Sequence, residues 1–176
     1  MRKVKRKKTT LKEPMNSNKR ILLIAVIGVI AVAVAILMMI ENQSGKIRVT
    51  NNTDLKLKDL KAYFVYAEGR VDETTYEYTN VEPGTKQVKD LSAINLLGRE
   101  ANLEIRFDFE GYEGKYLVDA GLFNDKFDGK INITFDKAEE GLVSMKVKAS
   151  NGFITSKLIT CDEEHKIDYQ NGELIE

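Results

Sequence analysis

The stretch LEIRFDF, residues 103–109, alternates apolar and charged side chains without a break. Successive side chains of a β-strand point to opposite faces, so these residues would form one apolar face and one charged face. The pattern predicts a half-buried strand. Because a single strand cannot bury its apolar face alone, further strands are expected on either side of it in the chain.

Other stretches supply those strands. INITF at 131–135 and VSMKVKA at 143–149 alternate in the same way, so each offers an apolar face to a common core. AYFVY at 62–66 is apolar on both sides, which is typical of a central strand. Together these runs predict a sheet structure from residue 46 to the end of the chain.

Turn sequences separate the predicted strands at short intervals. Pro83-Gly84 suits a type II turn, and Asn171-Gly172 predicts a two-residue hairpin that pairs Tyr169 with Leu174. Ser92–Leu97 is the one segment in this region expected to form a helical turn. The remaining turns are expected at 51–54, 111–114, 124–129, 139–141 and 151–152.

Frequent turns and about eight short strands predict an all-β antiparallel sandwich of immunoglobulin-like architecture over residues 46–176. Its topology, the order of the strands, stays unassigned. The chain has one Cys and no Trp, so it lacks the disulfide and the buried tryptophan of true immunoglobulin domains. A small open barrel is the alternative architecture.

Upstream of this region, ILLIAVIGVIAVAVAILMMI at 21–40 contains no charged, amide, hydroxyl or aromatic side chain. A helix of this length covers about 30 Å, the thickness of the hydrocarbon core of a bilayer. A core helix of a soluble domain would carry polar residues on one face, and none occur here. The run therefore predicts a single transmembrane helix.

Charge predicts the orientation of that helix. Residues 1–20 carry nine basic residues and one acidic residue, whereas residues 41–176 carry 18 basic and 26 acidic residues, a net charge of −8. The positive-inside rule places the basic tail in the cytoplasm and the C-terminal domain outside it. The expected location is the cell membrane, with a single pass.

A cleavable signal peptide is the main alternative to a permanent anchor. A signal peptide usually has an apolar region of about 7 to 15 residues followed by a small-residue cleavage site. The run here is longer, and Met38-Met39-Ile40-Glu41-Asn42 is a poor cleavage site. We therefore expect an uncleaved signal anchor. The predicted organisation is a disordered basic cytoplasmic tail at 1–20, the helix at 21–40, a short linker at 41–45 and an extracytoplasmic β-sandwich at 46–176.

Four small residues recur along one side of the predicted membrane helix: Ala25, Gly28, Ala31 and Ala35. Small residues let membrane helices approach closely, so this side allows a homodimer or docking to another membrane helix. The basic residues between Arg2 and Lys8 have no interleaved aromatic residues. We interpret them as an orientation signal with lipid contact and expect no nucleic-acid partner.

Residues that could carry catalysis are few. His165 and Cys161 are the only residues of their kinds, and the acidic residues between them suggest a polar loop that follows a strand ending at Cys161. Two ligands are too few for a structural zinc site. The segment 124–129 contains carboxylates and a glycine, but Lys126 and Phe127 occupy places where a calcium loop needs ligands. We expect no catalytic, cofactor-binding or metal-binding residues, and no cofactor.

These observations favour a non-catalytic protein. The predicted function is a membrane-anchored module that presents the sandwich to a membrane or envelope protein, through a sheet face or an exposed edge strand. A sensor or ligand-binding domain for ions or envelope polymers is the alternative. A hydrolase that uses its many carboxylates is a third class, although no spacing singles out a pair.

Overall fold

The computed structural model describes residues 17–41, 45–96, 98–124, 126–151 and 159–175. The chain divides into two compact units, residues 1–39 and 40–176. The predicted disordered tail lies outside the described residues as far as residue 16, and the predicted linker lies outside them at 42–44.

The apolar run forms a helix, as predicted. Helix α1 extends over Ser17–Glu41, 25 residues, and includes the whole of Ile21–Ile40. Its large apolar side chains from Ile21 to Leu37 are exposed, between 39% and 70%. Among the described residues, however, none of the helices is both long and apolar enough for a membrane crossing. The structure thus supports the helix and does not show the transmembrane span.

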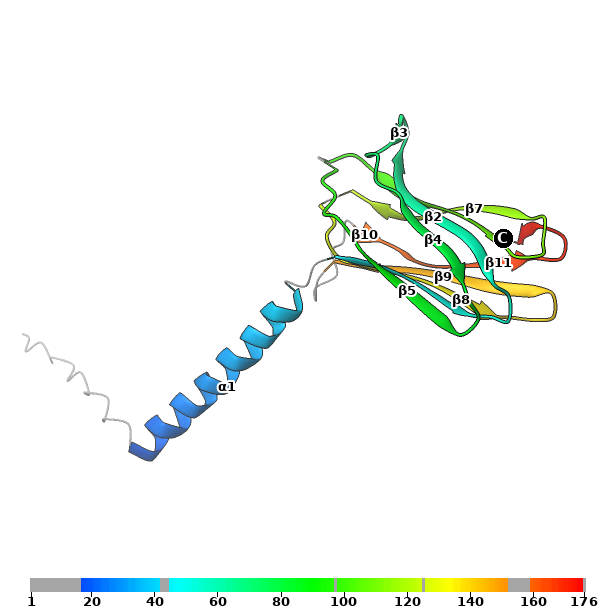
Figure 1. The fold of residues 1–176 in the computed structure, drawn as a ribbon. Coiled ribbons are helices and arrows are strands. Elements are labelled where there is room, and N and C mark those ends of the chain that lie inside the picture. The colour runs from blue at the N-terminus through cyan, green and yellow to red at the C-terminus, as the bar shows by residue number, and fades with distance from the viewer. Residues whose placement is uncertain (1–16, 42–44, 97, 125, 152–158, 176) are drawn as a thin grey trace, which may run out of the picture. The chain divides into compact units, whose positions relative to one another are not determined.

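The second unit contains two sheets that stack as a sandwich (Figure 1). The first sheet has six strands, in the order β12 (Glu173–Ile175), β11 (Asp162–Asp168), β9 (Leu142–Ser150), β8 (Lys130–Lys137), β1 (Lys46–Asn52) and β5 (Thr85–Asp90). The second sheet has β10 (Ile159–Thr160), β7 (Lys115–Phe123), β6 (Ala101–Phe109), β2 (Leu57–Tyr66) and β3 (Gly69–Arg70), with β4 (Tyr76–Val81) also paired to β2.

The predicted half-buried strands are confirmed. Residues 103–109 lie in β6, 131–135 in β8 and 143–149 in β9, and in each strand the apolar side chains are buried. Strand β2 has neighbours on both sides, with β6 on one and β3 and β4 on the other, so 62–66 is central as predicted. The period of two in the sequence therefore identifies the inner face of each of these strands.

Aromatic rings fill the space between the sheets. Phe109, Phe123, Phe127, Phe135 and Tyr78 are among the largest side chains that are fully buried. The rings of Phe107 in the second sheet and Phe135 in the first meet edge to face, with centroids 5.0 Å apart. Burying a large apolar side chain contributes about 1.5 to 3 kcal/mol, so these rings are a main source of stability.

One strand pair departs from the predicted antiparallel arrangement. Strands β1 and β8 run parallel, with Ile47 opposite Ile131 and Val49 opposite Ile133. The other strand pairs of the described residues are antiparallel. Antiparallel hairpins leave a local turn signal, whereas a parallel neighbour comes from a distant part of the chain, so this pair could not be predicted from local patterns.

Two local predictions were wrong. Ser92–Leu97 forms no helical turn among its described residues, because Ile94 makes a β-bridge to Phe127 with N–H···O distances of 2.8 and 2.9 Å. In the last hairpin Leu174 lies opposite Ile167, not Tyr169. Tyr169 belongs to a four-residue loop, since the carboxylate of Asp168 accepts hydrogen bonds from the N–H groups of Gln170 and Asn171 at 3.0 and 2.9 Å.

The Pro83-Gly84 turn forms as predicted. The N–H of Thr85 donates to the carbonyl of Glu82 at 3.2 Å, and Gly84 has φ 71°. The strands that it joins lie in different sheets, because β4 pairs with β2 and β5 pairs with β1. This turn therefore carries the chain from the second sheet to the first.

Candidate binding surface

Cys161 and His165 do not form a catalytic pair. Residues 162–168 form strand β11, not the predicted polar loop, and Asp162 and Glu164 pair on its outer face with lysines of β9 at 2.6 and 3.9 Å. Four residues of extended chain separate Cα positions by about 13 Å. The imidazole of His165 is therefore out of hydrogen-bond reach of the Cys161 thiol.

The environment of Cys161 also makes its thiol a poor nucleophile. The side chain is 4% exposed, and its Sγ lies 3.7 Å from the carbonyl oxygen of Val147. Burial, together with the nearby carboxylate of Glu163, raises the pKa of the thiol to about 12. Since the thiolate is the reactive form, Cys161 is a structural residue.

The segment 124–129, weighed as a calcium loop, instead supports the core. Phe127 is fully buried and packs edge to face against Phe123, with ring centroids 5.1 Å apart. Lys126 forms an ion pair with Asp128 at 2.9 Å. Asp125 lies outside the described residues. The part of the chain that the structure describes contains no group of three residues able to hold a metal ion.

The outer face of the second sheet carries a connected group of charged side chains. Tyr63, Glu104 and Asp119 lie opposite one another on β2, β6 and β7. The Tyr63 hydroxyl donates to the carboxylate of Glu104, and Nε of Arg106 binds the same carboxylate at 2.6 Å. The guanidinium of Arg70 lies 3.8 Å from the centre of the Tyr63 ring. Because these side chains cover it, Tyr63 is only 5% exposed although it points outward from the sheet.

The two carboxyl groups of this row have opposite pKa shifts. Burial disfavours ionisation of Glu104, but the hydrogen bonds from Tyr63 and Arg106 outweigh it and lower the pKa of this carboxyl. Burial, with the negative charge of Glu104, raises the pKa of Asp119. These shifts are those of a mutually bonded surface network, in which Glu104 already has its partners.

A hollow of about 310 Å³ adjoins this row, lined by Asp59, Lys61, Arg106, Phe107, Asp108, Lys115, Tyr116 and Leu117. Most of its charged groups have partners within the sheet. Lys61 pairs with Glu77 at 3.0 Å, and the carboxylate of Asp108 accepts a hydrogen bond from the N–H of Asp59 at 3.0 Å. A ligand here would have to compete with these internal partners, so the hollow is not our leading candidate.

The exposed edge strands are also weak candidates. Strand β5 pairs with β1 on one side only, and nearly all of its residues are exposed. It carries Lys86 and Lys89, and charged edge residues, lysine above all, discourage the addition of another strand. The ring of Tyr78 lies 5.5 Å from Nζ of Lys89 and the Gln87 amide donates to the carbonyl of Thr79 at 3.2 Å, so β4 contacts this edge.

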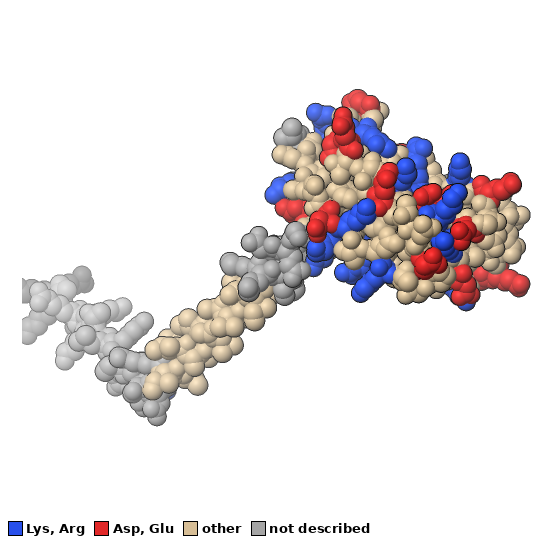
Figure 2. Space-filling view, viewed as in Figure 1, with Lys and Arg blue, Asp and Glu red and all other residues tan. Residues whose placement is uncertain are grey.

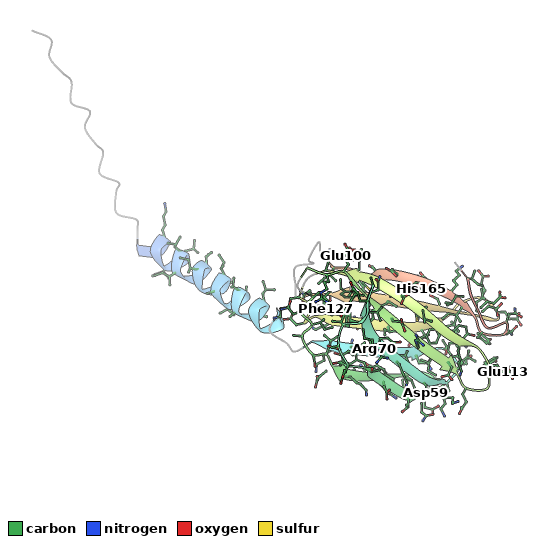
Figure 3. All side chains as sticks on the ribbon, turned by 90° about the horizontal axis from the view of Figure 1, so that it is seen from above. Asp59, Arg70, Glu100, Glu113, Phe127 and His165 are labelled. Atoms are coloured by element: carbon green, nitrogen blue, oxygen red, sulfur yellow. The ribbon has the colours of Figure 1, made fainter. Side chains whose placement is uncertain are left out.

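The end of the sandwich opposite the start of β1 offers a different surface, which we call the loop end. It consists of five loops, residues 53–56, 82–84, 110–114, 138–141 and 169–172. In Figure 1 these loops lie at the right-hand end of the sandwich, and Figure 3 labels Glu113 there. The loops contain six acidic residues and one lysine. Figure 2 shows acidic side chains at this end.

Two tyrosines contact each other at the loop end. The rings of Tyr112 and Tyr169 meet edge to face, with centroids 5.0 Å apart. Tyr112 is 38% exposed, whereas Tyr169 is partly buried and packs against the core, where Phe109 lies 6.4 Å from it. Exposed tyrosines held by packing are typical anchors of protein interfaces, because they lose little conformational freedom on binding.

A buried polar group fixes the loop beside these tyrosines. Asn51 is fully buried, and its amide nitrogen donates to the carbonyls of Leu55 and Val81 at 2.7 and 2.9 Å. Its amide oxygen accepts from the N–H and the hydroxyl of Thr53 at 3.1 and 2.7 Å. Three of the four bonds of the Asn51 amide thus hold residues 53–55 in place, and the fourth joins Asn51 to Val81 at the end of β4.

No site residue was predicted at the loop end. Residues 111–114 and 139–141 were predicted to form turns and Tyr169 to belong to a strand, but a turn sequence does not indicate which loops meet in the fold. The contact between Tyr112 and Tyr169 joins residues 57 positions apart. Comparison with protein families, with curated proteins and with solved structures finds no match for this chain.

Proposed function

We propose that this protein is a single-pass membrane protein whose β-sandwich lies outside the cytoplasm and binds another membrane or envelope protein through the loop end. The proposal assigns no catalytic step and no cofactor. One observation carries it: the exposed Tyr112 ring, held by Tyr169 among loops rich in acidic residues, offers an apolar anchor with a polar rim. Protein interfaces have this anatomy.

The membrane part of the proposal rests on the sequence of α1. The run Ile21–Ile40 has no charged residue, and its leucine, isoleucine and valine side chains favour insertion by about 0.3 to 0.6 kcal/mol each. A bilayer would cover the apolar side chains that α1 exposes.

The architecture of the second unit suits a binding module. Immunoglobulin-like sandwiches present binding loops at the ends of rigid sheets. Here strand β1 begins at Lys46, next to the predicted linker, and runs toward the loop end. Its seven residues span about 23 Å. The loop end is therefore the end of the sandwich farther from the attachment of the anchor.

Cysteine labelling tests the proposed topology. Lys166→Cys places a thiol on the exposed outer face of β11, and Thr10→Cys places one in the N-terminal tail. A membrane-impermeant maleimide added to intact cells should label the first variant and not the second, while native Cys161 stays unlabelled because it is buried. Labelling of Thr10→Cys alone would show that the orientation is reversed.

Crosslinking tests the proposed partner. A membrane-impermeant amine crosslinker on intact cells should join the tagged chain to a defined protein. Tyr112→Ala should remove the adduct, whereas Leu117→Ala, which truncates a side chain of similar exposure on the second sheet, should leave it. An adduct that survives Tyr112→Ala and disappears with Leu117→Ala would move the binding site to the sheet face.

A further inference from the structure

Resting on the proposed function, we infer that the partner presents a basic segment, with lysine or arginine side chains, to the aromatic groove at the loop end. The tyrosine pair and the groove beside it form the contact surface. The acidic residues around them select the charge of the occupant.

The groove has the size of a side-chain pocket. It encloses about 220 Å³ and adjoins Tyr169 on one wall, so it continues the surface formed by the tyrosine pair. Leu55, Leu142 and Val143 give it an apolar part. The long aliphatic stems of lysine and arginine suit such a mixed groove, because they bury apolar atoms while the charged head remains near polar groups.

The charges that line the groove are negative on balance. Asp54, Glu139, Glu140 and Lys137 line it, and Lys137 forms an ion pair with Asp54. Within the residues that the structure describes, Glu139 and Glu140 have no cation within ion-pair distance. These two carboxylates are therefore available to a cation brought by a partner.

The one lysine of the loop end, Lys56, is already paired with carboxylates. Nζ of Lys56 lies 3.5 Å from a carboxylate oxygen of Glu82 and 3.2 Å from one of Glu110. Glu113 follows Tyr112 directly in the chain and, in the described part of the structure, forms no ion pair. The tyrosine pair thus lies between unpaired carboxylates, Glu113 on one hairpin and Glu139 and Glu140 on another.

Aromatic faces add attraction for the same kind of group. A guanidinium or ammonium over the face of a tyrosine ring is attracted by the negative charge density of that face. This domain already makes the contact once, since Arg70 covers the Tyr63 ring at 3.8 Å. Tyr112 offers an exposed ring of the same type with carboxylates close to it in the chain, and the described structure places no cation over it.

The net charge of the whole domain favours the same kind of partner as the charges at the groove. Residues 41–176 have a net charge of −8, which attracts cationic partners and repels acidic ones. The hollow on the second sheet, in contrast, mixes three cations with two carboxylates that are largely paired. A basic partner is therefore best matched at the loop end.

The test measures binding of a fluorescent peptide of alternating arginine and serine to the full chain in nanodiscs of phosphatidylcholine. Neutral lipid avoids binding to the bilayer, and the bilayer separates the basic N-terminal tail from the sandwich. Two double variants are compared with the natural chain. The loop-end variant carries Glu139→Gln and Glu140→Gln, and the control variant carries Glu68→Gln and Glu73→Gln. Both sets remove two exposed carboxylates, but the second set lies near β3, at the opposite end of the sandwich.

We expect the loop-end pair to weaken binding about tenfold and the control pair less than about twofold, since a close charge pair contributes more than a distant one. Tyr112→Ala should weaken binding at unchanged charge. Equal losses of peptide affinity in the two double variants would show non-specific electrostatic attraction and overturn the assignment. If the natural chain does not bind the peptide while the Tyr112-dependent cellular adduct is retained, the basic partner is rejected and the proposed function stays in place.

Discussion

Gly121 and Cys161 contact each other so closely that a Cβ atom on Gly121 would lie 2.5 Å from the Cβ of Cys161. Gly121 belongs to β7 in the second sheet, and Cys161 directly precedes β11 in the first. Gly121 has φ 68° and lies where the pairing of β6 with β7 shifts by one residue, as in a β-bulge. This contact joins the two sheets at one edge of the sandwich.

Gly121→Ala should destabilise the domain strongly. The new methyl group would meet Cys161, and the backbone would be strained at positive φ. We expect a loss of about 3 kcal/mol in the free energy of unfolding, from about 1 kcal/mol of backbone strain and about 2 of steric conflict. Urea unfolding followed by circular dichroism measures it.

Gly98→Ala is the matched control. Gly98 has a similar φ of 78°, but nothing lies within 4 Å of its added Cβ. It should cost only the backbone term, about 1 kcal/mol. Equal losses for the two variants would show that the contact between Gly121 and Cys161 is unimportant.

The thiol of Cys161 should react slowly with disulfide reagents in the native chain. A pKa of about 12 instead of 9.0 lowers the thiolate fraction about a thousandfold at neutral pH, and burial slows access further. Reaction with an aromatic disulfide reagent, followed by absorbance, should be fast in urea and at least a thousandfold slower without it. Comparable rates in the two conditions would contradict the buried position.

Alkaline pH should destabilise the sandwich. Burial raises the pKa of Tyr78 well above 10.0, and burial likewise raises the pKa of Cys161 above 9.0. Both groups are held neutral in the folded state, so the unfolded state loses protons first and gains relative stability as the pH rises above about 9. Urea midpoints should therefore fall between pH 8 and pH 11.

Tyr78→Phe separates the contribution of that tyrosine. The variant loses the hydrogen bond from the hydroxyl to the carbonyl of Ile47, 2.8 Å long, and should be about 1 kcal/mol less stable at pH 7. It should also lose less stability than the natural chain above pH 10, because residue 78 no longer ionises. A parallel decline of both proteins would show that Tyr78 does not contribute to the alkaline transition.

Asn51→Ala should loosen the loop end. The substitution removes the side-chain partner of the Val81 carbonyl and of the Thr53 N–H, and it leaves the Leu55 carbonyl with the Thr53 hydroxyl alone, at 3.1 Å. We therefore expect a cost of about 2 to 4 kcal/mol. Asn52→Ala removes an exposed amide that binds Asp136 at 2.8 Å, and it should cost less than about 0.5 kcal/mol. Similar thermal shifts for the two neighbours would contradict the assigned role of Asn51.

The strands could be predicted because the alternation of apolar and polar residues that indicates each strand lies within a few consecutive residues. Residues 103–109, 131–135 and 143–149 each show a period of two, and the buried face of each strand is the apolar one. The parallel pairing of β1 with β8 was not predictable, since the two strands are about 80 residues apart and no turn links them. Ser92–Leu97 resembled a helical turn locally, but Ile94 gains a bridge to Phe127 through tertiary contact.

The loop end could not be predicted from the sequence, because its loops are far apart in the chain and meet only in the folded sandwich. Glu139-Glu140-Gly141 and Tyr112-Glu113-Gly114 are recognisable as turns, yet only the folded sandwich brings Tyr169 between these loops. The acidic residues between Cys161 and His165 suggested a loop, whereas the strand that contains His165 is identified by its pairing with β9. Charge was the one global signal, because the surplus of acids after residue 40 could be counted.

Photocrosslinking at residue 112 tests the central claim most directly. A photoreactive phenylalanine analogue replaces Tyr112 in one chain and Leu117, on the second sheet, in another, and both chains are irradiated in intact cells. We predict an adduct of one defined mass from position 112, none from position 117, and a crosslinked peptide rich in lysine and arginine. An adduct from position 117 with none from position 112 would contradict binding through the loop end.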